Sequence, residues 1–545
     1  MMRPVRDTYL NPILMKYSRY LRRILPWVAG LGLLFALFTS GISRNPPGFS
    51  IDESCYAYNA YVVAKTGAGE VGPRFPLFFE VFRDGFAQIY HPVHEYLLAI
   101  VFLFFPPSIL VARMFSAFGI FSTCLLTGLL ARRISGRRTI GVIVAAMALV
   151  TPWFFEYARL AWETHLVPLL TILYLLWVYR AQSKVRWGLV DITLIVSALA
   201  LLTYCYASGR ALAPLMAAGL VFLVTTRQRV IDVAKTWLFY GLTWVPVFFY
   251  SRQHPGALSK RIQEVSYIRL DGSWSDMASH FVKRYLEDQN LTGLLLAGDY
   301  HPRHHVQGAG GAIFFATFIL ALIGLVIVIA CRRSDPWWRF VLYGLAAAVV
   351  PGAISVEPFH QSRLLAYPLF LLLLTIPTLE WLLARTEQKS DLGLSSSGRT
   401  SDVSLEDAQP AGHTVTRESW PRWVRLGLLG LLLALTCVET YRFQTVFRRE
   451  GPKRLYEFDV PYKEAYDLAV KQPVRPIYLE DGKWGPAYIH ALWYATLEKR
   501  PISQFVRLKA GTKPPAGAIV ISSADTCEHC QTIKHPGVYL VYKAL

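Results

Sequence analysis

Two adjacent carboxylates, Asp52 and Glu53, stand in the segment NPPGFSIDESCYAYNAY (45–61), whose residue types could do chemistry. Ser50 and Glu53 have the spacing of a capping box, which predicts that a helix begins here. Asp52 adds negative charge at the positive end of that helix, yet one acid already satisfies the cap. Asp52 is therefore the better candidate for a chemical role, because a carboxylate in such a place can act as a general base.

Ionisable and aromatic residues recur in five later segments, each beside an apolar stretch. These segments hold Asp84, His91, His94 and Glu95; Glu156, Arg159, Glu163 and His165; Tyr204, Tyr206 and Arg210; Asp299, His301, Arg303, His304 and His305; and Glu357, His360 and Arg363. Such groups are costly at the edge of a bilayer unless they are paired or solvated, so we expect them to share one polar cavity. Carboxylates there would act as bases or stabilisers, and Arg and His would hold a phosphate.

The composition predicts the elements that position these residues. The chain has 545 residues, 53% hydrophobic and 17% charged, and its many long apolar runs predict a polytopic all-α membrane protein with about 11 transmembrane helices. The formal net charge of +19 suggests a nucleic-acid partner at first sight. Membrane proteins concentrate Lys and Arg in cytoplasmic loops, so we expect no nucleic acid.

The positions of the basic turns predict a topology in the cytoplasmic membrane, with every strongly basic turn inside. A short apolar stretch, 95–105, ends at two prolines and is expected to lie on the outer surface without crossing. The predicted parts are a cytoplasmic N-terminus (1–23), a membrane module (24–385) with external loops 43–110, 156–165 and 251–310, a disordered cytoplasmic linker (386–421), a last span (422–441) and an extracytoplasmic α/β domain (442–545).

The last hundred or so residues are soluble in character. PIYLED, GAIVISS and GVYLVYK have the pattern of strands, and GPAYIHALWYATL has the pattern of a helix. Cys527 and Cys530 would form a short disulfide loop in an oxidising compartment. A zinc site with His529 and His535 is the less favoured reading, because no second ligand pair accompanies them.

Four segments occur in a recognisable order: GFSIDESCYAYNAYVVAKTG, HPVHEYLLA, VARMFSAFGIFSTCLLTGLLARRISGRR and TPWFFEYARLAWETHLVPLL. In order and spacing they resemble the GT-C membrane glycosyltransferases, specifically the protein O-mannosyltransferase and aminoarabinose-transferase-like group. YCYASGRALAPL and PFHQSRLLAYPLFLLL are similar to later segments of bacterial members. The resemblance covers roughly residues 20 to 385, and the tail has a matching architecture.

This resemblance implies an inverting transfer of a sugar from a polyprenyl-phosphate donor to a lipid, glycan or protein acceptor, on the extracytoplasmic surface. It implies that Asp52 is the general base, a role that burial of the carboxyl group would favour. Glu53 matches the second acid, with a capping or orienting role. Arg159 and Glu163 match the motif of the second external loop, where the Arg would face the lipid phosphate.

The chain also departs from the family pattern. Aminoarabinose transferases read DETRYA and EKP where this chain reads DESCYA and YHP, so Cys55 and His91 replace a phosphate-binding Arg and Lys. Positive charge for the donor phosphate would then come from His91, Arg159, Arg210 or Arg363, while Glu163, Tyr204 and His360 would bind or orient substrate. No metal is required. A divalent cation on Asp52 with Glu163, or on the HPRHH loop, is a less favoured reading.

Two other functions fit a membrane protein of this kind. A transporter or a flippase of lipid-linked glycans needs many spans and a polar path, but such proteins usually have internal repeats and charges near the bilayer midplane. The polar clusters here lie at the ends of the apolar stretches instead. A scaffold that presents the C-terminal domain to a partner would leave Asp52 unexplained, so we expect an enzyme.

Overall fold

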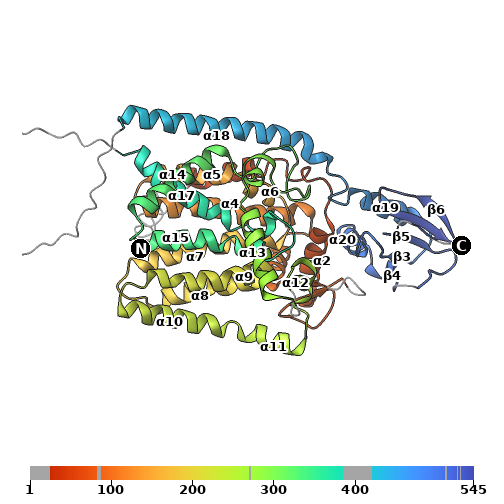
Figure 1. Cartoon of the computed structure of the whole chain (residues 1–545). Helices are drawn as coiled ribbons and strands as arrows, with labels where there is room; N and C mark the ends of the chain where they lie inside the picture. Colours follow the sequence, from red (N-terminus) through yellow and green to blue (C-terminus); the bar gives the residue numbers. More distant parts are fainter. Residues whose placement is uncertain are drawn as a thin grey trace, which may run out of the picture.

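The computed structural model describes residues 25–82, 88–268, 272–384, 420–509, 512–524, 526–527 and 529–545. Most of these residues form a bundle of helices that run side by side along one axis (Figure 1). The labelled bundle helices are α4 (Ile109–Ser135), α5 (Arg138–Val150), α7 (Leu166–Gln182), α8 (Leu189–Cys205), α9 (Ala207–Gly219), α10 (Arg227–Leu242), α11 (Val245–Gln253), α14 (Phe315–Cys331), α15 (Pro336–Ala347), α17 (Tyr367–Leu382) and α18 (Arg422–Glu450). The predicted fold class, a helical membrane module followed by a small α/β domain, is confirmed.

The bundle has the apolar outer surface and the helix lengths that are typical of a membrane protein. Large apolar side chains point outward from it, such as Phe118, Val142 and Leu431, each more than 60% exposed, as expected where lipid covers the surface. Three described helices are long and apolar enough to cross a membrane, and seven more are apolar but only 10–17 residues long. Prolines at or near the start of α6 (Pro152–Tyr157), α11 and α16 (Val350–Ala353) divide longer apolar stretches into pairs of helices.

Arginine-rich turns gather at one end of the bundle. Arg137, between α4 and α5, donates to the backbone oxygen of Leu383 at 3.0 Å, just beyond α17. Arg332, after α14, forms an ion pair of 2.7 Å with Glu380. Tyr179 near the end of α7 donates to the backbone oxygen of Arg133 at 3.2 Å. The basic turns that the topology assigns to one side of the membrane therefore do lie together.

Helix α2 (Ile51–Thr66) crosses the opposite end of the bundle (Figure 1). It begins at the predicted capping box, in which the Ser50 side chain accepts from the Glu53 amide and the Glu53 side chain accepts from the Ser50 amide. It ends at Gly67, whose φ of 75° is a conformation that glycine adopts without strain. The cap fixes where the helix starts, and so it fixes the direction in which Asp52 points.

Helix α3 (Pro92–Phe104) packs against α2 at this end of the bundle. Its 13 residues give a length of about 20 Å, which is too short to cross a bilayer. A two-stranded antiparallel sheet, β1 (Phe79–Val81) and β2 (Gln88–Tyr90), lies between α2 and α3 in the sequence. The sequence predicts that the apolar stretch 95–105 does not cross the membrane, and the length of α3 agrees with this prediction.

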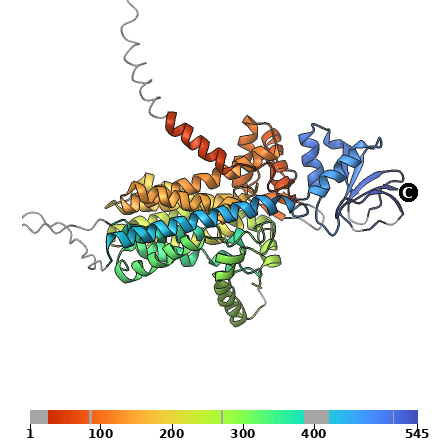
Figure 2. The same ribbon diagram turned by 90° about the horizontal axis from the view of Figure 1, so that it is seen from above.

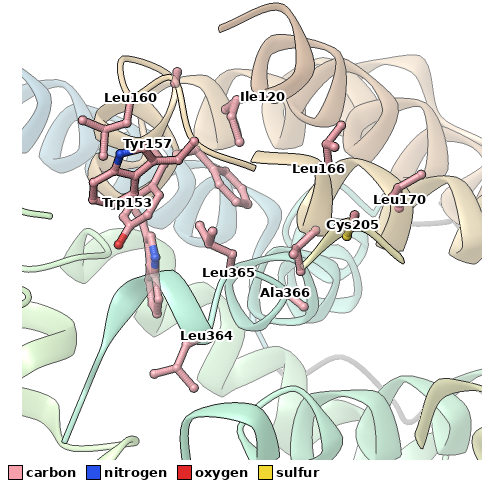
Figure 3. Close-up of a cluster of buried hydrophobic side chains, with 14 of the residues drawn as sticks. Ile120, Trp153, Tyr157, Leu160, Leu166, Leu170, Cys205, Leu364, Leu365 and Ala366 are labelled. Carbon is pink, nitrogen blue, oxygen red and sulfur yellow. The ribbon is translucent and has the colours of Figure 1, made fainter. Parts of the chain in front are cut away.

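A buried apolar cluster supports the same end of the bundle. Figure 3 shows Trp153 and Tyr157 of α6 close to Leu364, just after the short turn Gln361–Arg363. The Trp153 indole donates to the backbone oxygen of Gln361 at 3.2 Å, which ties the cluster to that turn. The cluster therefore fixes the backbone that carries His360 and Arg363.

The C-terminal domain packs its helix α20 (Tyr488–Leu497) against α2, and it lies at the end of α18 (Figure 1). Its sheet has the strand order β4-β3-β5-β7-β6, in which β3 pairs in parallel with β4 and β5, and β7 pairs antiparallel with β5 and β6. The elements are α19 (Val460–Lys471), β3 (Ile477–Glu480), α20, β4 (Phe505–Arg507), β5 (Ile519–Ser522), β6 (Cys530–Lys534) and β7 (Leu540–Ala544). The helix and the three strands predicted from the sequence are all present.

Cys527 and Cys530 form a disulfide beside strand β6, which agrees with the favoured reading of this pair. The predicted cytoplasmic N-terminus, 1–23, and nearly all of the predicted linker, 386–421, lie outside the described residues. Asp84 of the second cluster lies outside them as well.

Candidate active site

One cavity of about 580 Å³ opens at the end of the bundle that α2 crosses. Its wall is built by α2, β2, the first turn of α9, and loops around residues 163, 257–266, 301–304 and 351–363. Six of the nine site residues predicted from the sequence line it: Asp52, His91, Glu163, Arg210, His360 and Arg363. Glu53, Arg159 and Tyr204 do not line it.

Asp52 is in the second position of α2 and faces the cavity. The Tyr90 hydroxyl donates to Asp52 Oδ1 at 3.0 Å, and Arg303 Nη1 lies 3.6 Å from Asp52 Oδ2. Burial raises the pKa of Tyr90 well above its usual value, and the nearby charge of Asp52 raises it further, so Tyr90 remains a donor. The Asp52 side chain is 38% exposed, and the burial expected of a general base is therefore not found.

Glu53 is buried beneath the cavity and has a structural role. Besides capping α2, it pairs with Arg113 of α4, whose Nε donates to Oε1 at 2.9 Å and whose Nη2 donates to Oε2 at 3.0 Å. The Ala161 amide donates to Oε1 at 3.0 Å. Both oxygens are occupied by protein donors, so the structure shows the predicted capping role, and the catalytic role of Glu53 stays a prediction.

His91 lies between Glu163 and Arg210 in a chain of hydrogen bonds. Arg210 Nη2 lies 2.6 Å from His91 Nε2. Because a guanidinium can only donate, Nε2 must accept and Nδ1 must carry the hydrogen. Nδ1 then donates to Glu163 Oε1 at 3.1 Å, and the His91 amide donates to Oε2 at 3.3 Å. Glu163 thus orients His91, and His91 orients Arg210 toward the cavity.

Two arginines of the cavity wall have nitrogen atoms without a partner. Arg210 Nε and Arg363 Nη1 are buried and have no hydrogen-bond acceptor among the described residues. The other end of the Arg363 guanidinium is held by Glu357, to which Nη2 donates at 2.8 Å. Arg210 and Arg363 themselves line the cavity, so their guanidinium groups are the positive charges that a ligand in the cavity would meet.

His360 and His304 stand together in the cavity wall, with their ring centroids 4.5 Å apart. Asp299 Oδ2 accepts from His304 Nδ1 at 2.8 Å, which leaves Nε2 of His304 for the cavity. His360 contacts Ser362 and Glu357. Burial lowers the pKa of His360 well below its usual value, and the nearby His304 and Arg363 lower it further. His360 therefore acts as a neutral ring that can bind or orient a substrate.

Asp299, His304 and His360 are also close enough to be considered as metal ligands, because one ligand atom from each lies within 4.8 Å of the others. The carboxylate of Asp299 already accepts from His304, from the His301 amide and from the Gln361 amide. These bonds, together with burial, which opposes them, leave the pKa of Asp299 below its usual value. The carboxylate therefore fits its present donors better than a divalent cation. A cation on Asp52 with Glu163, or on the HPRHH loop, stays a prediction.

Arg159 is buried and does not line the cavity, and its role as a phosphate ligand stays a prediction. Its Nη2 donates to the backbone oxygen of Phe38 at 2.6 Å, and its Nη1 donates to that of Phe155 at 2.8 Å. The guanidinium lies over the Phe155 ring, 3.4 Å from the centroid. Arg159 thus joins the first helix (Leu25–Phe38) to the segment after α6, which is a packing role.

Tyr204, near the end of α8, is predicted from the sequence to bind or orient substrate, but it does not line the cavity. Its hydroxyl donates to the backbone oxygen of Thr243 at 2.7 Å, and its ring packs near Phe78. The neighbouring Tyr206 lines the cavity instead. The helix ends between the two residues, so the aromatic side chain that faces the cavity comes from the other side of the break.

The sequence reasoning missed several residues that shape the site. Tyr90 belongs to the YHP segment but received no role there, and Arg113 lies inside an apolar run where nothing local suggests a partner. Arg303 and His304 belong to a predicted cluster but received no role from the sequence, although both line the cavity. Asp459 of the C-terminal segment lies far from the site in sequence and contacts α2 directly. Only long-range packing reveals these residues.

Solved structures share this architecture. ArnT from Cupriavidus metallidurans in the apo state aligns over 95% of this chain and 98% of that chain, with a TM-score of 0.56 and 14% sequence identity. ArnT bound to undecaprenyl phosphate aligns over the same shares, with a TM-score of 0.55 and 13% identity. An oligosaccharyltransferase of Archaeoglobus fulgidus tethered with an acceptor peptide aligns over 90% of this chain and 65% of that chain, with a TM-score of 0.47 and 13% identity.

No protein-family model matches the chain, and a search of curated proteins finds no match in sequence. The likeness to ArnT, an aminoarabinose transferase, spans almost the whole of both chains and so includes the C-terminal domain. The chain is accordingly a membrane protein with the GT-C fold that the order of its sequence motifs predicted.

Proposed function

We propose that the protein is an inverting glycosyltransferase that moves a sugar from a polyprenyl-phosphate donor to a hydroxyl group of a lipid, glycan or protein. The GT-C fold supports a membrane-bound transferase, although a fold alone does not assign a reaction. The cavity supplies the rest of the argument. It brings a carboxylate and two incompletely paired arginines to one end of a membrane bundle.

The observation that carries the proposal is that two arginines, Arg210 and Arg363, line the same cavity as Asp52. Arginine binds phosphate oxygens through several N–H groups at once, and such bonds are strong because both groups are charged. A phosphodiester of a polyprenyl phosphate and a sugar presents such oxygens beside the carbon atom that reacts. One of the ArnT structures is bound to undecaprenyl phosphate, which supports this choice of donor.

The proposed chemistry is a single displacement. The acceptor hydroxyl oxygen attacks the anomeric carbon, its proton passes to the Asp52 carboxylate, and the bond from the carbon to the phosphate oxygen breaks. The polyprenyl phosphate leaves with the electron pair of that bond, and Arg210 and Arg363 stabilise its charge. Tyr90 and Arg303 hold Asp52 in position, and the chain from Glu163 through His91 holds Arg210.

We also propose that the cavity opens on the extracytoplasmic side of the cytoplasmic membrane. The support is electrostatic: the arginine-rich turns lie at the opposite end of the bundle, and such turns favour the cytoplasm. The C-terminal domain lies at the cavity end (Figure 1) and would then be extracytoplasmic, a location that suits its disulfide.

Deletion of the protein followed by mass spectrometry of the surface glycans tests the reaction. One sugar should disappear, wild-type protein should restore it, and Asp52→Asn should not, although the variant is inserted in equal amount. An unchanged glycan profile after deletion, or full restoration by Asp52→Asn, would overturn the proposal. Movement of a lipid-linked glycan across the membrane without any change in its sugars would instead favour the flippase alternative.

A further inference from the structure

Helix α13 (Trp274–Glu287) has one apolar face and one polar face. Its apolar residues recur every three to four positions, which is the spacing of an amphipathic helix. These residues are Trp274, Met277, Ala278, Phe281, Val282, Tyr285 and Leu286. The polar face carries Asp276, Ser279, His280, Lys283 and Glu287. At 100° per residue the apolar residues cover about half of the helix surface.

Only one edge of this apolar face contacts the rest of the protein. Tyr285 donates to the backbone oxygen of Ala346 at 3.0 Å. Within the helix, the rings of Phe281 and Tyr285 pack on each other with centroids 5.8 Å apart, so both lie on this edge. The other edge is open: Trp274 is 85%, Val282 57% and Leu286 64% exposed. No side chain of the helix is buried. A continuous apolar edge of this kind indicates a surface that something apolar covers.

The position of α13 indicates what covers it. Figure 2 shows the helix projecting sideways from the bundle, across the direction of the spanning helices, at the end where α2 and the cavity lie. A helix that crosses the axis of the spans at the level where they end lies in the plane of the membrane surface. Phe248 and Phe249 in the middle of α11 are 58% and 57% exposed, as expected where lipid covers the helix.

We propose that α13 is an in-plane membrane helix whose open apolar edge, Trp274, Ala278, Val282 and Leu286, inserts at the boundary between headgroups and acyl chains. Trp274 stands at the start of the helix and has the amphipathic ring that favours this boundary. Lys283 lies on the opposite face, where its ammonium group remains among the headgroups and water. The partner is thus the bilayer itself on the cavity side.

This contact with lipid would also set the position of the cavity wall. Asp288 follows α13 directly, and its Oδ1 accepts from the Phe359 amide at 2.6 Å. Phe359 belongs to the turn that brings Glu357, His360 and Arg363 to the cavity. The helix therefore connects the membrane surface to the arginine that we assign to the phosphate of a lipid carrier. This last step depends on the proposed function, whereas the insertion of α13 does not.

Spin labels on single cysteines test the insertion. Serine first replaces Cys331 and Cys437, the exposed free cysteines of the described residues. A label is then placed at 278 or 282 on the apolar edge, or at 279 or 283 on the polar face as matched controls. The labelled protein is studied in liposomes of phosphatidylcholine and phosphatidylglycerol. Accessibility to oxygen relative to a water-soluble nickel chelate should be several-fold higher at 278 and 282 than at 279 and 283.

Equal accessibility ratios at all four positions would overturn the proposal, because they place the helix in water or against a soluble partner. Spectral broadening that disappears on dilution with unlabelled protein would overturn it too, since it indicates a second copy on this edge. Val282→Asp should lower the ratio at 278 several-fold, whereas the control Ser279→Asp should leave it unchanged. Elution volume and thermal unfolding of each variant show that it is folded.

Discussion

Asp459 accepts a hydrogen bond from the backbone amide of Ile51, the first residue of α2, at 3.0 Å from Oδ2 to N. Its other oxygen accepts from the Tyr539 hydroxyl at 2.6 Å. One turn further along α2, the Ser54 hydroxyl lies 2.8 Å from His490 Nδ1 of α20. The helix that carries Asp52 is thus capped by the chain and held by the C-terminal domain.

Asp459→Ala should lower the turnover of the enzyme more than its affinity for donor. The substitution leaves the Ile51 amide without an acceptor, and the loss of such a cap costs about 0.5–2 kcal/mol. The start of α2 is then held less firmly, so the Asp52 carboxylate is positioned less accurately in the cavity. The kinetic constants of purified protein measure this, with Asp467→Ala of the exposed Lys463–Asp467 pair as the control. Equal turnover in both variants would contradict a positioning role for Asp459.

Removal of Arg113 should destabilise the folded protein and not merely slow the reaction. Arg113 and Glu53 form an ion pair of 2.9 Å with no exposed side-chain surface on either residue. A buried carboxylate that loses its partner costs about 3–5 kcal/mol. Arg113→Met should therefore lower the thermal midpoint strongly, and Arg113→Met with Glu53→Gln should recover part of the loss. A normal thermal midpoint together with lost activity would instead support the catalytic role predicted for Glu53.

Arg210→Gln should weaken the binding of undecaprenyl phosphate by about 10-fold or more, because a hydrogen bond to a charged group contributes about 1.5–3 kcal/mol. Arg159→Gln is the informative control, since Arg159 contacts only backbone oxygens and aromatic rings away from the cavity. Its folded fraction should bind with unchanged affinity. The reverse result, with weaker binding only in Arg159→Gln, would refute the assignment of the phosphate site.

Asp288→Asn should change how stability depends on pH. Burial raises the pKa of Asp288 from 3.8 to about 7, so the folded protein holds this proton more tightly than the unfolded chain. The stabilisation from the proton is fully present below the unfolded value and is lost as the pH rises through the folded one. Between pH 5 and pH 8 the thermal midpoint should therefore fall less in Asp288→Asn than in wild type. Parallel pH curves would show that Asp288 is ionised in the folded state.

Local patterns predicted a good part of this protein. The capping box at Ser50 and Glu53 indicated the start of α2, because its signal lies within four residues. The apolar runs and basic turns indicated the bundle, and alternation of residue types indicated the strands of the C-terminal domain. Asp52 does line the cavity, and it was singled out because Glu53 alone already explained the cap.

The parts of the site that the sequence could not give have a common physical reason. Arg159 stands beside acids in a polar loop, which is also what a phosphate ligand looks like, but its guanidinium contacts the backbone of Phe38, more than a hundred residues away. Arg113 lies in an apolar helix, and only the fold places Glu53 next to it. An arginine can bind a ligand only where the fold places it in the wall of a cavity, and that depends on tertiary contacts.

The contacts of Asp459 and His490 have a consequence for biogenesis. Both residues follow α18 in the sequence, whereas α2 precedes nearly all helices of the bundle. The start of α2 therefore lacks this outer support until the segment after α18 has been translated. A nascent chain that stops before Asp459 would carry Asp52 on a helix that nothing yet holds from outside.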